Sequence, residues 1–86
     1  MYAHIVNVDF TDLDAVMADL ADVIPNAQVA PGFVAGYWIR LDDSHATSLT
    51  VFETEDQARA TTPPVGSSMR GVTVTAVQIG EVVGRA

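Results

Sequence analysis

The stretch from Pro31 to Glu53, PGFVAGYWIRLDDSHATSLTVFE, decides the fold. Residues 33–41 are rich in aromatic and β-branched side chains, which favour a part-buried strand. Residues 42–45, DDSH, supply turn formers, and residues 46–53 form a return strand rich in Thr, Val, Leu and Phe. The stretch therefore predicts a β-hairpin, and it carries the only Trp, one of the two Tyr and two of the three Phe.

The pairing of this hairpin predicts two covered faces. A turn centred on Asp43 and Ser44 sets Leu41 opposite Ala46, and Trp38 opposite Leu49. Both faces then carry large apolar side chains, whereas a sheet with one solvent face alternates more regularly. Helices can cover one face, so we expect a second surface to cover the other.

The N-terminal part predicts a strand followed by a helix. Residues 2–10 read as a strand whose even and odd positions point to opposite faces. Apolar residues then recur at helical spacing, which predicts a helix over residues 12–24. Thr11 fits its N-cap, with Asp14 as a weak capping-box partner, and Pro25 fits its end.

The C-terminal part predicts a short helix and a last strand. Thr54 caps the helix and Gln57 completes a capping box, while the prolines at positions 63 and 64 end it. Residues 72–83 form the last strand, in which Gly80 predicts a bulge or a close backbone approach. The order strand, helix, strand, strand, helix, strand predicts one α+β domain over residues 1–86, with a ferredoxin-like split βαβ fold and an antiparallel four-stranded sheet.

Composition narrows the partners and the location. The formal net charge is −7, with four Arg and no Lys, so a nucleic acid would be repelled. The absence of cysteine excludes a disulfide, a thiol nucleophile and a thiolate metal site. No leader or membrane-spanning stretch is apparent, so we expect no membrane association and a cytoplasmic protein.

The hairpin also carries a family resemblance. The segments PGFVAGYWIR (31–40) and SLTVFE (48–53), followed by the helix opening TEDQA (54–58), resemble the antibiotic-biosynthesis-monooxygenase-like (ABM-like) group of dimeric α+β barrel proteins. The resemblance implies a homodimer in which two four-stranded sheets pack face to face as an eight-stranded barrel. That arrangement supplies the second surface that the hairpin requires.

The resemblance implies several activities. Some members oxidise aromatic polyketides without a cofactor, others open the haem macrocycle, and others have no settled chemistry. The haem-opening members use an Asn on the first strand, a Trp in the second helix and a downstream His. Asn7 matches the first, but the second helix has no Trp and no His follows His45, which argues against haem degradation.

The candidate pocket residues are Asn7, Tyr37, Trp38 and Arg40. Cofactor-free oxidation needs an electron-rich substrate held as its enolate or phenolate, which such cationic or hydrogen-bonding groups stabilise and an aromatic ring stacks upon. The alternative is structural: Trp38 packs in the core or an interface, and Arg40 pairs with an acid across strands.

Other chemistry has little support in the sequence. No nucleophile is paired with a base, no metal-ligand spacing occurs and no phosphate loop is present, so we expect neither metal nor cofactor and assign no catalytic residue. His45 is expected in an exposed turn, and His4 as a satisfied barrel or interface residue. The prediction is a cofactor-independent monooxygenase or related enzyme that acts on a small aromatic molecule in a small apolar pocket between the sheet and the helices. The alternative is a non-catalytic small-molecule binder or structural dimer.

Overall fold

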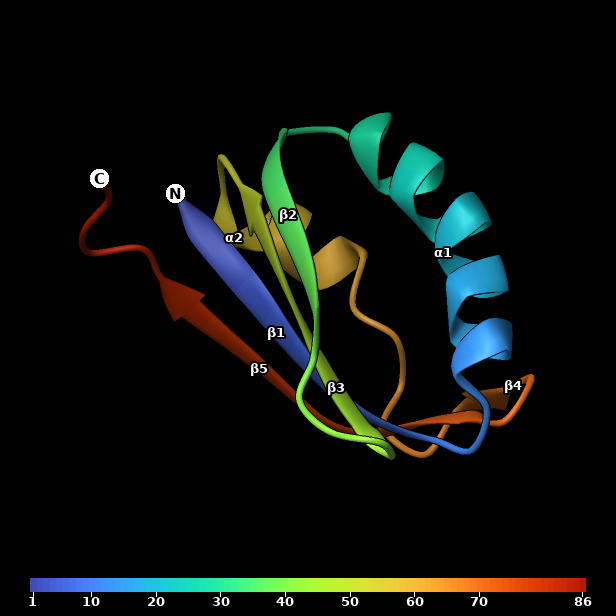
Figure 1. Ribbon diagram of the computed structural model, residues 1–86. Helices are drawn as coiled ribbons and strands as arrows, with labels where there is room; N and C mark the ends of the chain where they lie inside the picture. Colours follow the sequence, from blue (N-terminus) through green and yellow to red (C-terminus); the bar gives the residue numbers. More distant parts are fainter.

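The computed structural model describes residues 1–86, and for Met69 it describes the backbone alone. Both helices lie on one face of a single antiparallel sheet, whose strands follow the order β2-β3-β1-β5-β4 (Figure 1). The elements are β1 (Tyr2–Phe10), α1 (Leu13–Gln28), β2 (Phe33–Arg40), β3 (His45–Phe52), α2 (Glu55–Ala60), β4 (Ser68–Met69) and β5 (Val72–Glu81).

The architecture is α+β and compatible with a ferredoxin-like fold. Four long strands lie in the order β2-β3-β1-β5, as expected for two interleaved βαβ units. The predicted first strand is confirmed over Tyr2–Phe10. The two-residue strand β4, which pairs with the start of β5, was not predicted because the Gly- and Ser-containing stretch around it reads as a loop.

Helix α1 begins and ends later than predicted. Its N-cap is Asp12, whose side chain accepts a hydrogen bond from the backbone N–H of Asp14, so the assignment of Thr11 is wrong. The helix also continues through Pro25 to Gln28. Proline has no backbone N–H, so the helix continues through Pro25 without the hydrogen bond that this position would donate to the carbonyl of Ala21.

The register of the β2–β3 hairpin differs by one residue from the expected one. Trp38 lies opposite Ser48, not opposite Leu49, and Arg40 lies opposite Ala46. The connecting loop includes Leu41 and is closed by Asp42, whose Oδ1 accepts the backbone N–H groups of residues 44 and 45, each at 2.8 Å. A one-residue shift exchanges the faces of one strand relative to the other. Leu49 therefore lies on the face opposite Trp38.

The bulge predicted at Gly80 lies elsewhere. Gly80 pairs regularly with Ala3, and nothing lies within 4 Å of a Cβ built on it. The irregularity in the β1–β5 pairing falls between Asn7 and Val8, opposite Thr75. The sequence does not indicate a bulge at Thr75, because threonine is a good strand former.

The core is small and centres on the sheet and α2. Phe52 is 1% exposed and packs against the rings of His4 and Phe33. Helix α2 contributes Ala58, and its predicted capping box between Thr54 and Gln57 is confirmed. Helix α1 has no buried residue at all, so it stands off from the sheet.

Candidate functional site

A cleft of about 830 Å³ lies between α1 and the sheet, and we call it the α1 cleft. Its volume falls within the roughly 300–1,000 Å³ typical of small-molecule sites. The walls are mostly apolar side chains of β1, α1 and β5. The apolar residues that line it from these elements are Val6, Val8, Phe10, Leu13, Val16, Met17, Leu20, Val23, Ala27, Val72 and Val74.

The sequence explains why the cleft stays open. Helix α1 carries the predicted apolar stripe, yet Leu13 and Met17 remain exposed beside the cleft. Below the helix, strand β3 presents the small side chains of Ala46 and Ser48. A well-packed domain fills such a space with apolar side chains, so the space is available to a ligand.

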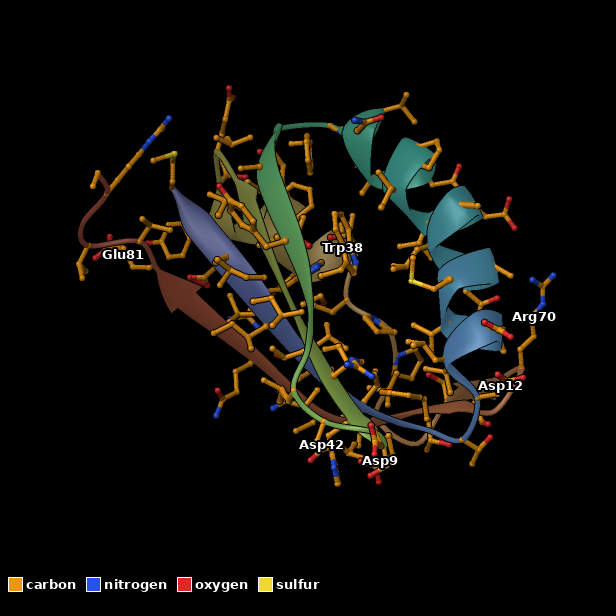
Figure 2. All side chains as sticks on the ribbon, viewed as in Figure 1. Asp9, Asp12, Trp38, Asp42, Arg70 and Glu81 are labelled. Carbon is orange, nitrogen blue, oxygen red and sulfur yellow. The ribbon has the colours of Figure 1, made fainter. Side chains whose placement is uncertain are left out.

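The indole of Trp38 is the large aromatic group of the cleft. It extends from β2 into the space between the sheet and α1 (Figure 2). A Cβ built on Gly36 would lie 2.8 Å from the far end of the indole, so the ring lies directly over this glycine. Trp38 therefore offers a flat apolar surface against which an aromatic ligand can stack.

His4 reaches the cleft from β1 and is tied to α2. Only 6% of the residue is exposed, and its Nδ1 lies 3.1 Å from the carbonyl oxygen of Ala58. The hydroxyl of Thr61 lies 3.2 Å from the same nitrogen. Since a carbonyl oxygen can only accept, Nδ1 is the donor, and Nε2 of the neutral ring carries no hydrogen.

An ion pair joins α1 to the turn between β4 and β5. Nη1 of Arg70 lies 3.0 Å from Oδ1 of Asp19, a cleft-lining side chain that is 13% exposed. Arg70 adopts φ +52°, and Gly71 beside it accepts the backbone N–H of Thr11. The turn thus holds α1 at its N-terminus and along its side, where Arg70 and Asp12 are visible in Figure 2.

The four predicted pocket residues fall on two faces of the sheet. Trp38 and Arg40 line the α1 cleft together. Tyr37 lies on the opposite face and is 60% exposed. Asn7 lies on the same face as Tyr37. Tyr37 pairs with Leu49, Leu49 pairs with Ile5, and Asn7 is two residues from Ile5 on β1, so all four side chains point to one side of the sheet.

Arg40 lies at the mouth of the cleft and its side chain is about half exposed. Its Nη1 is 3.7 Å from Oδ1 of Asp43 in the hairpin loop. The expectation that Arg40 pairs with an acid on a neighbouring strand is therefore wrong, because the acid follows three residues later in its own chain segment. The pair is solvent-exposed and weak, so the guanidinium can turn toward a bound molecule.

His45 is exposed, as expected, but it is the first residue of β3 rather than part of the turn, and acids surround it. Its Nδ1 is 2.8 Å from Oδ1 of Asp42, and its Nε2 is 3.4 Å from Oδ1 of Asp9. The hydrogen bond and charge of Asp42 raise the pKa of His45. The pKa of Asp42 is lowered, first by the backbone N–H of Ser44 and then by the His45 side chain. This cluster lies outside the cleft (Figure 2) and closes the hairpin loop.

The sheet has a second, helix-free face. The pairing of the strands shows which side chains lie on this face, and those described in its central part carry no charge. A shallower hollow of about 520 Å³ lies there, beside the C-terminal segment. The residues of this helix-free face are Ala3, Ile5, Asn7, Ala35, Tyr37, Ile39, Thr47, Leu49, Val51, Ala76, Gln78 and Gly80. Two of them, Ile39 and Thr47, also border the α1 cleft.

Two features of the site escaped sequence reasoning. His4 and Val6 are two residues apart on β1, so the sequence correctly placed both on the same face of the sheet. The hydrogen bond from His4 to Ala58 was missed because Ala58 lies 54 residues further along the chain. The pairing of Asp19 with Arg70 gave no signal, because acids along a helix usually read as a solvated face. Both contacts depend on tertiary packing, so local spacing does not reveal them.

The described residues show neither a metal cluster nor a membrane-spanning helix. Among the described side chains, no three His, Asp or Glu gather closely enough to hold a metal ion. In the part of the chain that the structure describes, no helix is both long and apolar enough to cross a membrane. No family model, curated protein or solved structure matches the chain, so the ABM-like resemblance stays a prediction.

Proposed function

We propose that the protein binds a small, flat, mostly apolar aromatic molecule in the α1 cleft and oxidises it without a cofactor. The observation that carries the proposal is the cleft itself, a ligand-sized apolar space with Trp38 and Arg40 on its walls. Trp38 offers a stacking surface, and Arg40 at the mouth is a cation that stabilises negative charge on a bound enolate or phenolate.

The chain contains its own reporter for this proposal. Trp38 is the only Trp, so its fluorescence reports on the cleft alone. Titration with small non-fluorescent aromatic compounds should quench it saturably. Ser48→Phe, opposite Trp38 on β3, should place a ring against the indole and abolish the quenching, whereas the adjacent Leu49→Phe on the helix-free face should preserve it.

Turnover is tested separately from binding. Compounds that quench Trp38 are incubated with the protein in air, without metal or cofactor, while oxygen uptake is recorded. Oxygen uptake that Ser48→Phe abolishes supports an oxygenase. Saturable quenching without uptake favours the alternative, a non-catalytic binder, and the absence of quenching with every compound leaves the structural dimer.

We also propose that the helix-free face packs against a second copy of the chain to form a dimeric α+β barrel. On this face Tyr37 is 60% exposed and Ile39 is 46% exposed. Large apolar side chains gathered on the surface of a small domain often mark a contact with another protein. Two copies that each carry a net charge of −7 repel one another. The uncharged centre of the helix-free face is where that repulsion is least, which favours self-association there.

A further inference from the structure

Nε2 of His4 is a polar atom of the α1 cleft without a hydrogen-bond partner among the described residues. Among the hydrogen bonds of the described residues, His4 uses Nδ1 alone. Among the described residues that are buried or half-buried, every side-chain nitrogen or oxygen that is inaccessible to solvent has a hydrogen-bond partner. Since Nε2 has none, it must border accessible space, and the space that His4 lines is the α1 cleft.

The tie to α2 fixes what this nitrogen can do. Nδ1 donates to the carbonyl of Ala58, so the ring is held in one orientation and in one neutral tautomer. Nε2 then presents an unshared electron pair to an apolar space. A bare acceptor of this kind strongly favours a ligand with an O–H or N–H group over one without it, because an unpaired polar group in an apolar site is costly.

We propose that Nε2 of His4 anchors the ligand of the α1 cleft by accepting a hydrogen bond from a single O–H or N–H group on an otherwise apolar ring. The inference rests on the proposed small-molecule cleft and adds the residue that orients the molecule in it. The side chains that face His4 from the sheet and α2 are the ring of Phe52 and the hydroxyl of Thr61. Neither carries a charge, so the ligand enters as a neutral donor, and the protonated His4 ring is the charge that balances an anion formed there.

The same contact also gives a route for a proton. When the ligand's hydrogen moves to Nε2, the electron pair of its O–H or N–H bond stays on the ligand. The ring then carries hydrogen on both nitrogens, and Nδ1 still donates to Ala58. His4 thus supplies the acceptor that converts a bound hydroxyl compound into the anion that cofactor-free oxidation requires.

The test compares naphthol with its methyl ether, which has the same ring and lacks the donor. Calorimetric titration of the wild-type chain should show naphthol binding about tenfold more tightly, the scale expected of one hydrogen bond. Equal affinity for the two compounds would overturn the anchor while leaving the cleft as a binding site. Binding of neither would refute the cleft function itself.

Two substitutions separate the anchor from the structural tie. His4→Asn keeps an N–H donor near the position of Nδ1 and removes the atom at the position of Nε2, so the preference for naphthol should vanish while the ether still binds. His4→Gln places an amide near the position of Nε2 and should retain part of the preference. A naphthol preference unchanged in folded His4→Asn would contradict the proposal.

Nitrogen NMR of histidine-labelled wild-type protein decides the matter where a variant fails to fold. The chain has two histidines, and His45 is exposed at the start of β3, outside the cleft, so it serves as an internal reference. Naphthol should shift the Nε2 resonance of His4, and the methyl ether should leave it nearly in place. Saturation with naphthol without a shift at this nitrogen would exclude the anchor.

Discussion

Oδ1 of Asp19 on α1 lies 3.0 Å from Nη1 of Arg70 in the turn between β4 and β5. Helix α1 buries no side chain of its own, so this ion pair is one of the few contacts that hold it over the cleft. The Asp19 side chain is 13% exposed and that of Arg70 is 55% exposed, so solvent screens the pair in part. The pair therefore controls the position of α1 more than the stability of the whole domain.

Asp19→Asn should loosen α1 selectively. Loss of a partly exposed pair is worth up to about 1 kcal/mol, which corresponds to roughly fivefold faster amide exchange if exchange occurs through local opening. Hydrogen-exchange mass spectrometry should show this acceleration in α1 and little change in β1. Asp22→Asn, an exposed acid on the same helix, is the matched control, and equal effects of both variants would contradict the role of the pair.

The hairpin loop should show a histidine that titrates above its ordinary value. Asp42, by its hydrogen bond and charge, raises the pKa of His45 above 6.5. NMR titration should detect this, and Asp42→Asn should return the pKa toward 6.5, since an amide still accepts the loop hydrogen bonds but carries no charge. Asp43→Asn, which removes the partner of Arg40 instead, should leave it raised.

The two groups of this loop act on stability in opposite pH ranges. A raised pKa at His45 adds stability that is fully present below pH 6.5 and is lost as the pH rises through the higher folded-state value. A lowered pKa at Asp42 adds stability that is present above pH 3.8 and is lost as the pH falls through the lower folded-state value. The loop should therefore be most stable between these two values, and Asp42→Asn should flatten both dependences in unfolding experiments.

Local patterns predicted the elements but not the way they meet. Alternation located β1, and the capping box of Thr54 located α2, because both signals lie within a few residues. The hairpin register escaped because Asp42 closes the loop through its side chain, which shifts the pairing by one residue. That single shift moved Leu49 to the face opposite Trp38, so the contents of both faces changed.

The candidate site was predicted in part for the same reason. Trp38 and Arg40 were expected on one face from their spacing alone, and both line the cleft. Asn7 and Tyr37 were grouped with them by chemistry, which carries no information on strand faces. An apolar pocket between the sheet and the helices was expected and lies under α1. Its volume could not be predicted, because the volume depends on how far α1 stands from the sheet.

Arg40→Ala and Trp38→Ala should differ in their cost to folding. Arg40 forms an exposed pair, so its loss should change the free energy of unfolding by under about 0.5 kcal/mol. Trp38 is half-buried over an open cleft, so truncation should cost roughly 1–2 kcal/mol, below the approximately 3–5 kcal/mol of a fully buried aromatic side chain. Urea unfolding of both variants measures this, and a loss above 3 kcal/mol for both would contradict a pocket role.

Gly36→Ala should move the indole without removing it. The added Cβ would meet Cη2 of Trp38 at 2.8 Å, and the ring must swing away because it is the far end of a side chain over open space. We expect a shifted fluorescence maximum and weaker aromatic binding with a nearly unchanged melting temperature. Gly80→Ala is the control, since nothing lies near its new Cβ. An unaltered Trp38 emission in Gly36→Ala would show that the ring does not lie over this glycine.

The helix-free face should carry the dimer contact. Sedimentation at micromolar concentration should give a mass near twice 9.1 kDa, because in the proposed dimer a second copy would cover the apolar surface around Tyr37 and Ile39. Tyr37→Arg places an unpaired charge at the centre of this interface, where burial costs several kcal/mol, roughly enough to dissociate a micromolar dimer.

A matched charge elsewhere separates a broken interface from a general effect of charge. Ala21→Arg adds the same side chain on an exposed position of α1 that does not line the cleft, and it should leave the dimer intact. Both variants bring the net charge from −7 to about −6 by the same one-unit step, so a difference between them reports on position alone. A wild-type chain that sediments as a monomer at every accessible concentration would exclude the barrel, and the apolar helix-free face would then need another partner.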